Sequence, residues 1–154
     1  MGLDNVVYVK IKLNKEHEYI HIPAIFPHNC EDSWLEYDLQ SPCLHFEMIY
    51  WRKWWGPRNK VVHNLQTKYG FEEEYCYYLD SEDIEMIIDV LEEYNNKVTW
   101  NEDGSPVWRY EDNIKDQIDV DINVLKRLAK FMRTSTYQDM VKNNTIEVYF
   151  IDSY

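Results

Sequence analysis

The residues best suited to binding chemistry lie in one segment, residues 50–64, where tryptophans are interleaved with cationic side chains. An indole face stacks on planar ligands, and a guanidinium group pairs with anions as well as stacking on rings. On a helix, the tryptophans of this segment could not all face the core. We therefore predict a site for a nucleotide-like ligand, or for an acidic loop of a partner protein. Its residues would be Trp51, Arg52, Lys53, Trp54, Arg58, His63 and Asn64. The alternative is that the tryptophans belong to the core and the cations are solvated.

A second candidate surface is defined by charge. The chain has a net charge of −12, and residues 72–121 alone contain seventeen acidic and three basic residues. An anionic surface attracts basic proteins and repels nucleic acid, so we expect a protein with a basic surface as partner and no direct nucleic-acid binding. The predicted contact residues are Glu82, Asp83, Asp89, Glu92 and Glu93. The alternative is that acidic and basic helices pair with each other and the remaining charges form a solvated face.

Catalytic and metal-binding motifs are not recognisable in the sequence. Residues 119–123 match the first half of a calcium-binding EF-hand loop, but Lys130 stands where that loop needs a bidentate glutamate. His28 and Cys30, like Cys43 and His45, are separated by one residue, whereas paired zinc ligands are usually separated by two to four. No phosphate loop, dinucleotide fingerprint or nucleophile elbow occurs. We therefore expect no metal, no cofactor and no catalytic residues.

Size and composition favour one domain that covers residues 1–154. No apolar run approaches the length needed to span a bilayer, and the first residues lack the features of a signal peptide. The three cysteines are an odd number, which favours free thiols in a reducing compartment. We therefore expect a cytoplasmic protein that does not contact membranes. The abundant tyrosine and tryptophan would also suit a homo-oligomer interface.

Alternating side chains predict the strands. In residues 6–13, Val7 and Val9 lie on one face and Tyr8 and Lys10 on the other, which is typical of a half-buried strand. A strand at residues 17–22 is expected to form a hairpin with this first strand, and strands at 97–100 and 107–110 are expected to form a second hairpin. Single strands are expected at 74–79 and 145–151. Residues 34–39 show a weaker alternation.

Helical spacing and capping residues predict the helices. Ser41 and Pro42 favour a helix start, and apolar residues then recur at helical spacing to Trp55, where Gly56 and Pro57 should break the helix. Further helices are expected from 61 to a stop at Gly70, from Asp80 or Ser81 to 94, from Asp119 or Asp121 to 132, and at 137–141 after Thr136. The predicted fold is α+β, with an antiparallel sheet (the N-terminal hairpin plus the C-terminal strand) packed on about four helices.

Four short motifs carry a resemblance to a known group of proteins. They are the tetrapeptide Tyr50-Trp51-Arg52-Lys53, the pair His63-Asn64, the helix opening at residues 77–82 and the aromatic stretch at 148–154. Together they resemble a family of small uncharacterised bacteriophage proteins that carry a YWRK motif, a nearby His-Asn and an aromatic-rich C-terminal strand. The likeness covers residues 44–154. This chain departs from the family pattern at Trp54-Trp55-Gly56-Pro57, because the sequences of the family resemble one continuous helix at that point.

The resemblance implies a phage or prophage origin and no assigned reaction. On that basis we expect a non-catalytic protein that inhibits a host system, such as an antiviral defence, through an acidic surface that mimics nucleic acid. Two other functions stay open at this point. The chain could sequester a nucleotide-like signal at the segment 50–64, or it could be a small enzyme that acts on such a ligand.

Overall fold

The computed structural model describes residues 4–12, 33–37, 42–71, 76–97, 99–103 and 115–153. Within these residues the chain has an α+β fold, as predicted. Its elements in chain order are β1 (Asp4–Lys12), β2 (Ser33–Tyr37), β3 (Pro42–Arg52), α1 (Trp55–Tyr69), β4 (Cys76–Tyr78), α2 (Ser81–Lys97), α3 (Lys115–Met132), α4 (Ser135–Lys142) and β5 (Ile146–Ser153).

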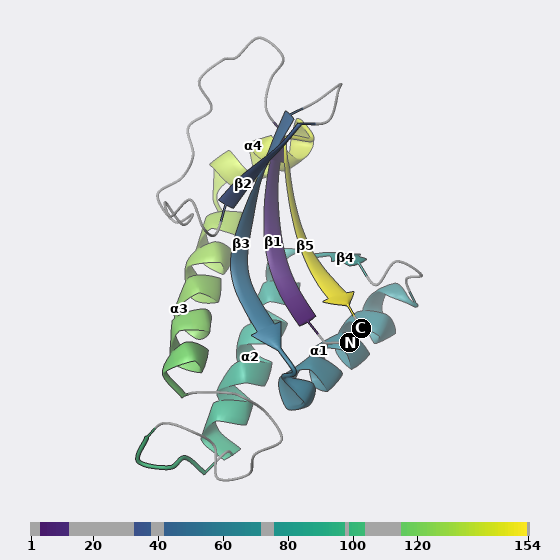
Figure 1. Ribbon diagram of the computed structural model, residues 1–154. Helices are drawn as coiled ribbons and strands as arrows, with labels where there is room; N and C mark the ends of the chain where they lie inside the picture. The colour runs from purple at the N-terminus through teal and green to yellow at the C-terminus, as the bar shows by residue number, and fades with distance from the viewer. Residues whose placement is uncertain are drawn as a thin grey trace.

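The five strands form one sheet in the order β2-β3-β1-β5-β4, and every neighbouring pair is antiparallel. The first and last strands of the chain lie side by side, with Val7 opposite Phe150 (Figure 1). This confirms the strands predicted near both ends of the chain. β1 has β3 on one side and β5 on the other. The predicted hairpin partner at residues 17–22 and the predicted strand at 107–110 lie outside the described residues, whereas the strand predicted to start at Lys97 is wrong there, because Lys97 is the last residue of α2.

The helix predicted to start at Ser41 is wrong, because residues 42–52 form the long strand β3. A β-bulge explains the misleading spacing. Val7 is opposite Ile49 and Tyr8 is opposite Glu47, so Met48 is an extra residue in β3. Because of this extra residue, Leu44 and Trp51 both contact the core although they are seven positions apart, a spacing that also fits two turns of a helix.

Helix α1 begins at Trp55, so Gly56 and Pro57 open a helix instead of breaking one. Proline is tolerated in a first turn because the amide hydrogens there have no intrahelical acceptor. The predicted stop is confirmed at Gly70, which has a φ of 85° and donates its N–H to Gln66 O over 2.8 Å. A left-handed residue after the last turn favours glycine, which has no Cβ to clash.

The other three helices are present where the sequence predicts them, α2 starts as predicted, and α3 and α4 start earlier than predicted. In α2 the predicted stripe is buried, from Ile84 to Leu91. α3 begins at Lys115, earlier than predicted, so Asp121 lies inside the helix and does not cap it. α4 is capped by Thr134, whose hydroxyl accepts a hydrogen bond from the N–H of Tyr137.

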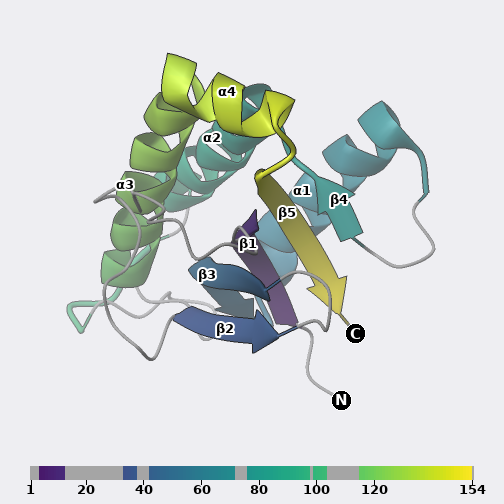
Figure 2. The same cartoon turned by 90° about the horizontal axis from the view of Figure 1, so that it is seen from above.

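The helices cover one face of the sheet, and the core lies between the two layers (Figure 2). Apolar residues on the inner face of the three longest strands, such as Val9 and Phe150, meet the apolar stripes of α2 and α3, such as Ile87 and Leu125. None of the helices that the structure describes is long and apolar enough to cross a membrane.

Candidate functional site

The two buried tryptophans of the predicted ligand site are core residues. Trp51 is 0% exposed and Trp54 is 4% exposed, and their rings stack at a centroid distance of 5.3 Å. Trp51 also meets Phe150 edge-on and donates its indole N–H to Asp121 Oδ2 over 3.1 Å. The faces of both rings are therefore covered by the protein. Trp55, which was not among the predicted site residues, is 44% exposed.

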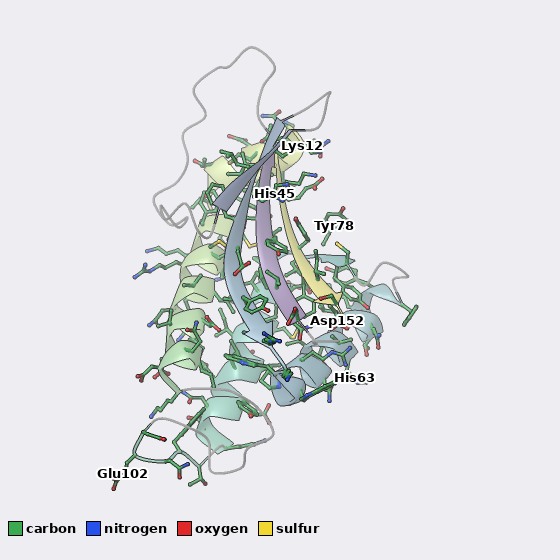
Figure 3. The ribbon with its side chains drawn as sticks, viewed as in Figure 1. Lys12, His45, His63, Tyr78, Glu102 and Asp152 are labelled. Atoms are coloured by element: carbon green, nitrogen blue, oxygen red, sulfur yellow. The ribbon has the colours of Figure 1, made fainter. Side chains whose placement is uncertain are left out.

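Arg58 is also taken up by internal contacts. Its Nε donates to Asp152 Oδ1 over 2.9 Å and its Nη2 donates to Asp152 Oδ2 over 2.5 Å. Asn5 Nδ2 donates to the same carboxylate over 2.6 Å. Asp152 lies at the end of β5, next to α1 (Figure 3). A buried bidentate pair of this kind is a structural contact between a helix and the sheet.

The remaining predicted ligand residues lie in two places. Arg52 and Lys53 are exposed at the end of β3, whereas Asn64 is half-buried in the middle of α1. His63, which Figure 3 labels, is exposed on the same helix. The structure therefore divides the seven predicted residues between the core and two exposed positions, and does not bring them together on one surface.

The acidic helix α2 lies between two sets of cations. It carries six carboxylates and one lysine, whereas α1 carries three cations and no carboxylate. Glu92 pairs with Lys126 of α3 over 2.7 Å, and Glu93 pairs with Lys60 of α1 over 2.6 Å. Glu85 pairs with Arg133 in the same way. The helical layer thus neutralises much of the charge that the sequence assigned to a partner-binding face.

Asp83 has a structural role. It is 3% exposed and accepts hydrogen bonds from Lys68 Nζ, the Tyr69 hydroxyl and the Asp80 N–H. Of the five predicted partner-binding residues, Glu82 and Asp89 are exposed and have no cationic partner among the described residues.

A polar cleft opens between the C-terminal half of α2 and the N-terminal half of α3, with a volume of about 570 Å³. We call it the α2–α3 cleft. It is lined by Glu92, Asn95, Asn96, Asp119, Ile122, Asn123 and Lys126. Side-chain oxygen atoms therefore dominate its wall, and Lys126 supplies its one ammonium group.

Asn95 is held in a fixed position in this cleft. Its Nδ2 donates to Asp119 Oδ1 over 3.0 Å, and its backbone oxygen accepts from the Trp100 indole N–H over 3.3 Å. Its other side-chain atom, Oδ1, is buried and has no hydrogen-bond partner within the described part of the chain. This oxygen is covered by the protein, so a ligand in the cleft would meet the carboxylates beside it and not the oxygen itself.

A second hollow lies between α1 and α2, with a volume of about 240 Å³, and we call it the α1–α2 pocket. It is lined by Gly56, Pro57, Lys60, Val90, Glu93, Tyr94 and Lys97. The hydrogen bonds from Lys60 and Lys97 lower the pKa of Glu93 to about 2. The carboxylate therefore stays ionised over the whole physiological range.

Sequence reasoning missed a row of tyrosines on the sheet face away from the helices. Tyr8, Tyr149 and Tyr78 are direct neighbours across β1, β5 and β4, with ring centroids 5.4 and 6.2 Å apart. His45 Nδ1 lies 3.2 Å from the Tyr149 hydroxyl (Figure 3 labels His45 and Tyr78). The alternation of Tyr8 with the buried Val7 was a signal that could have found this face.

No group of three or more histidine, cysteine or carboxylate residues that could hold a metal ion occurs among the described residues. Cys43, which was one of four weighed zinc ligands, is a buried free thiol.

No protein-family model, no curated protein and no solved structure matches this chain. The resemblance to phage proteins therefore stays a prediction, and function has to be inferred from the chemistry of the surfaces described above.

Proposed function

We propose that the chain is a non-catalytic binding protein that holds an arginine side chain of a basic partner protein in the α2–α3 cleft. The observation that carries this proposal is a polar cleft whose wall includes the carboxylates of Glu92 and Asp119 beside the side chain of Asn95. The cleft includes Glu92, which the sequence placed on the partner-binding surface.

The lining of the cleft selects a ligand that is rich in hydrogen-bond donors. The ionised side chains of Glu92 and Asp119 offer acceptors and no donor. A guanidinium group presents five donors in a rigid plane and has no acceptor. It could bond the Glu92 and Asp119 carboxylates together, whereas an ammonium is a compact point charge without that fork.

The charge of the whole molecule favours the same class of partner. A net charge of −12 attracts cationic proteins over long distances and raises their association rate. The ion pairs between α2 and its neighbouring helices leave little of that helix free to imitate a nucleic acid. We therefore propose that the cleft recognises the partner protein, and that the overall negative charge raises the rate at which the two proteins associate.

The direct test uses two peptides that differ only in the cation. An end-capped peptide with three Arg-Gly repeats and its Lys-Gly counterpart would be titrated into the protein, with binding measured by calorimetry at two salt concentrations. The arginine peptide should bind roughly tenfold tighter, because a bidentate pair gains about one additional charge-assisted hydrogen bond. The double variant Asn95→Ala/Asp119→Asn should abolish this preference.

Matched variants separate the cleft from bulk charge. Glu82→Gln/Asp89→Asn removes two exposed carboxylates outside the cleft and should keep the preference for arginine. Lys126→Gln removes the cation that pairs with Glu92 and should tighten binding of the arginine peptide. Equal affinity for both peptides would reject the cleft. A loss of binding in Glu82→Gln/Asp89→Asn as large as that in the cleft variant would instead favour the mimicry hypothesis.

The expectation that such binding inhibits a host system in the bacterial cytoplasm goes further than this proposal. This expectation predicts that the activity of a host enzyme falls when the protein is added in equimolar amount. The Asn95→Ala/Asp119→Asn variant, added in the same amount, should leave that activity unchanged. A fall that is equal with both proteins would show that inhibition does not use the cleft.

A further inference from the structure

The α1–α2 pocket has an apolar floor. Val90 is 5% exposed and belongs to the core cluster, and the partly buried Tyr94 packs against that cluster. Pro57 is buried in the opposite wall, and Gly56 beside it has no side chain to occupy the space. A ring that enters here would exchange water for aliphatic and aromatic contacts, which is favourable in proportion to the apolar area that it buries.

The rim of the pocket carries more positive than negative charge. Lys60 and Lys97 share the single carboxylate of Glu93, the first over 2.6 Å and the second in an i, i+4 pair on α2. The two ammonium groups have three donors each, so both can bond a further acceptor without leaving Glu93. Their side chains are 52% and 71% exposed, and are therefore accessible from solvent. The rim thus has one uncompensated positive charge.

We infer that the α1–α2 pocket binds a small planar molecule that carries one negative charge, such as an aromatic carboxylate. The apolar floor would hold the ring, and Lys60 and Lys97 would hold the anion. The volume of about 240 Å³ is small for a ligand pocket, and suits one ring system better than a complete nucleotide. The inferred ligand is smaller than the nucleotide-like molecule that the sequence led us to expect. The inference does not depend on the α2–α3 cleft.

The test compares two probes of nearly equal shape, 2-naphthoate and 2-naphthamide, of which only the first is charged. Each would be titrated into the full chain, with affinities taken from backbone amide shifts in two-dimensional NMR. Shifts should be largest at Gly56, Val90 and Tyr94. Naphthoate should bind about fivefold tighter than naphthamide, as expected for two exposed ion contacts of a few tenths of a kcal/mol each.

Two double variants with the same loss of charge make the test specific. Lys60→Gln/Lys97→Gln should bring naphthoate to the affinity of naphthamide and leave naphthamide binding unchanged. Arg127→Gln/Lys130→Gln removes two exposed cations of α3 outside the pocket and should keep the fivefold preference. Equal affinities for the two probes in the wild-type protein would overturn the inference. So would shifts centred on the tyrosine row, or an equal loss of preference in both variants.

Discussion

Asp121 shows how one residue can satisfy a sequence motif and still have another role. It stands third in the partial EF-hand match and was also a candidate helix cap, yet it is 2% exposed inside α3. Burial raises its pKa to about 6, although hydrogen bonds from Gln117 and Trp51 oppose the shift. The residue therefore anchors the Trp51 indole and is a carboxyl group that folding makes harder to ionise.

A prediction about pH follows for Asp121. Because its folded pKa lies above the unfolded value of 3.8, the folded state holds this proton more tightly, and the stabilisation that is present below about pH 4 is lost as pH rises through about 6. The loss should be about 3 kcal/mol. Urea unfolding of the wild type and of Asp121→Asn at each pH would measure it. The difference between the two proteins should change across this window, and a difference that stays constant would contradict the prediction.

At the scale of elements, α2 was the most predictable part of the chain and β3 the least. The stripe of α2 and its capping residue Asp80 follow from local spacing alone. Asp80 and Asp83 form a reciprocal cap, in which the N–H of each donates to the carboxylate of the other over 2.9 Å. β3 was mistaken for a helix because its bulge depends on the strand that pairs with it.

The cap of α2 can be tested by substituting two adjacent acidic residues, Glu82 and Asp83, one at a time. Asp83→Ala should destabilise the protein by about 1–2 kcal/mol, because it removes the acceptor of the Asp80 N–H and of the Tyr69 hydroxyl, whereas the exposed Lys68 keeps Asp80 as its partner. Glu82→Ala, one position earlier and exposed, should change stability by less than about 0.5 kcal/mol. Thermal and urea unfolding would measure both. Similar effects of the two variants would contradict the structural role of Asp83.

At the scale of the molecule, one buried contact ties the helical layer to the sheet. Arg58 of α1 meets Asp152 of β5, and Asn5 of β1 supports the same carboxylate. The three residues come from the two ends of the chain and from its middle. The contact therefore closes the fold at the place where the first and last strands are paired.

Removing one partner of this contact should be more harmful than removing both. Asp152→Ala should cost about 3–5 kcal/mol, because it removes the carboxylate that accepts two hydrogen bonds from the buried guanidinium. The double variant Arg58→Met/Asp152→Ala should recover part of that loss, since the buried positive charge is removed together with its carboxylate. Urea unfolding of the single and double variants gives the coupling free energy. Additive losses would show that Arg58 and Asp152 do not act as a pair.

The sequence by itself determined the fold class, the amphipathic helices, the stop at Gly70 and the two strands near the chain ends. Each of these depends on spacing within a few residues, which the sequence displays directly. Only the tertiary structure decided that Trp51, Trp54 and Arg58 are internal, that α2 is flanked by cations, and that Asn95 and Asp119 meet in one cleft. Those outcomes depend on which segments, distant in the sequence, become neighbours in the fold. The residues around a side chain in the sequence do not reveal which distant residues it will contact, so they do not reveal its interaction energy either.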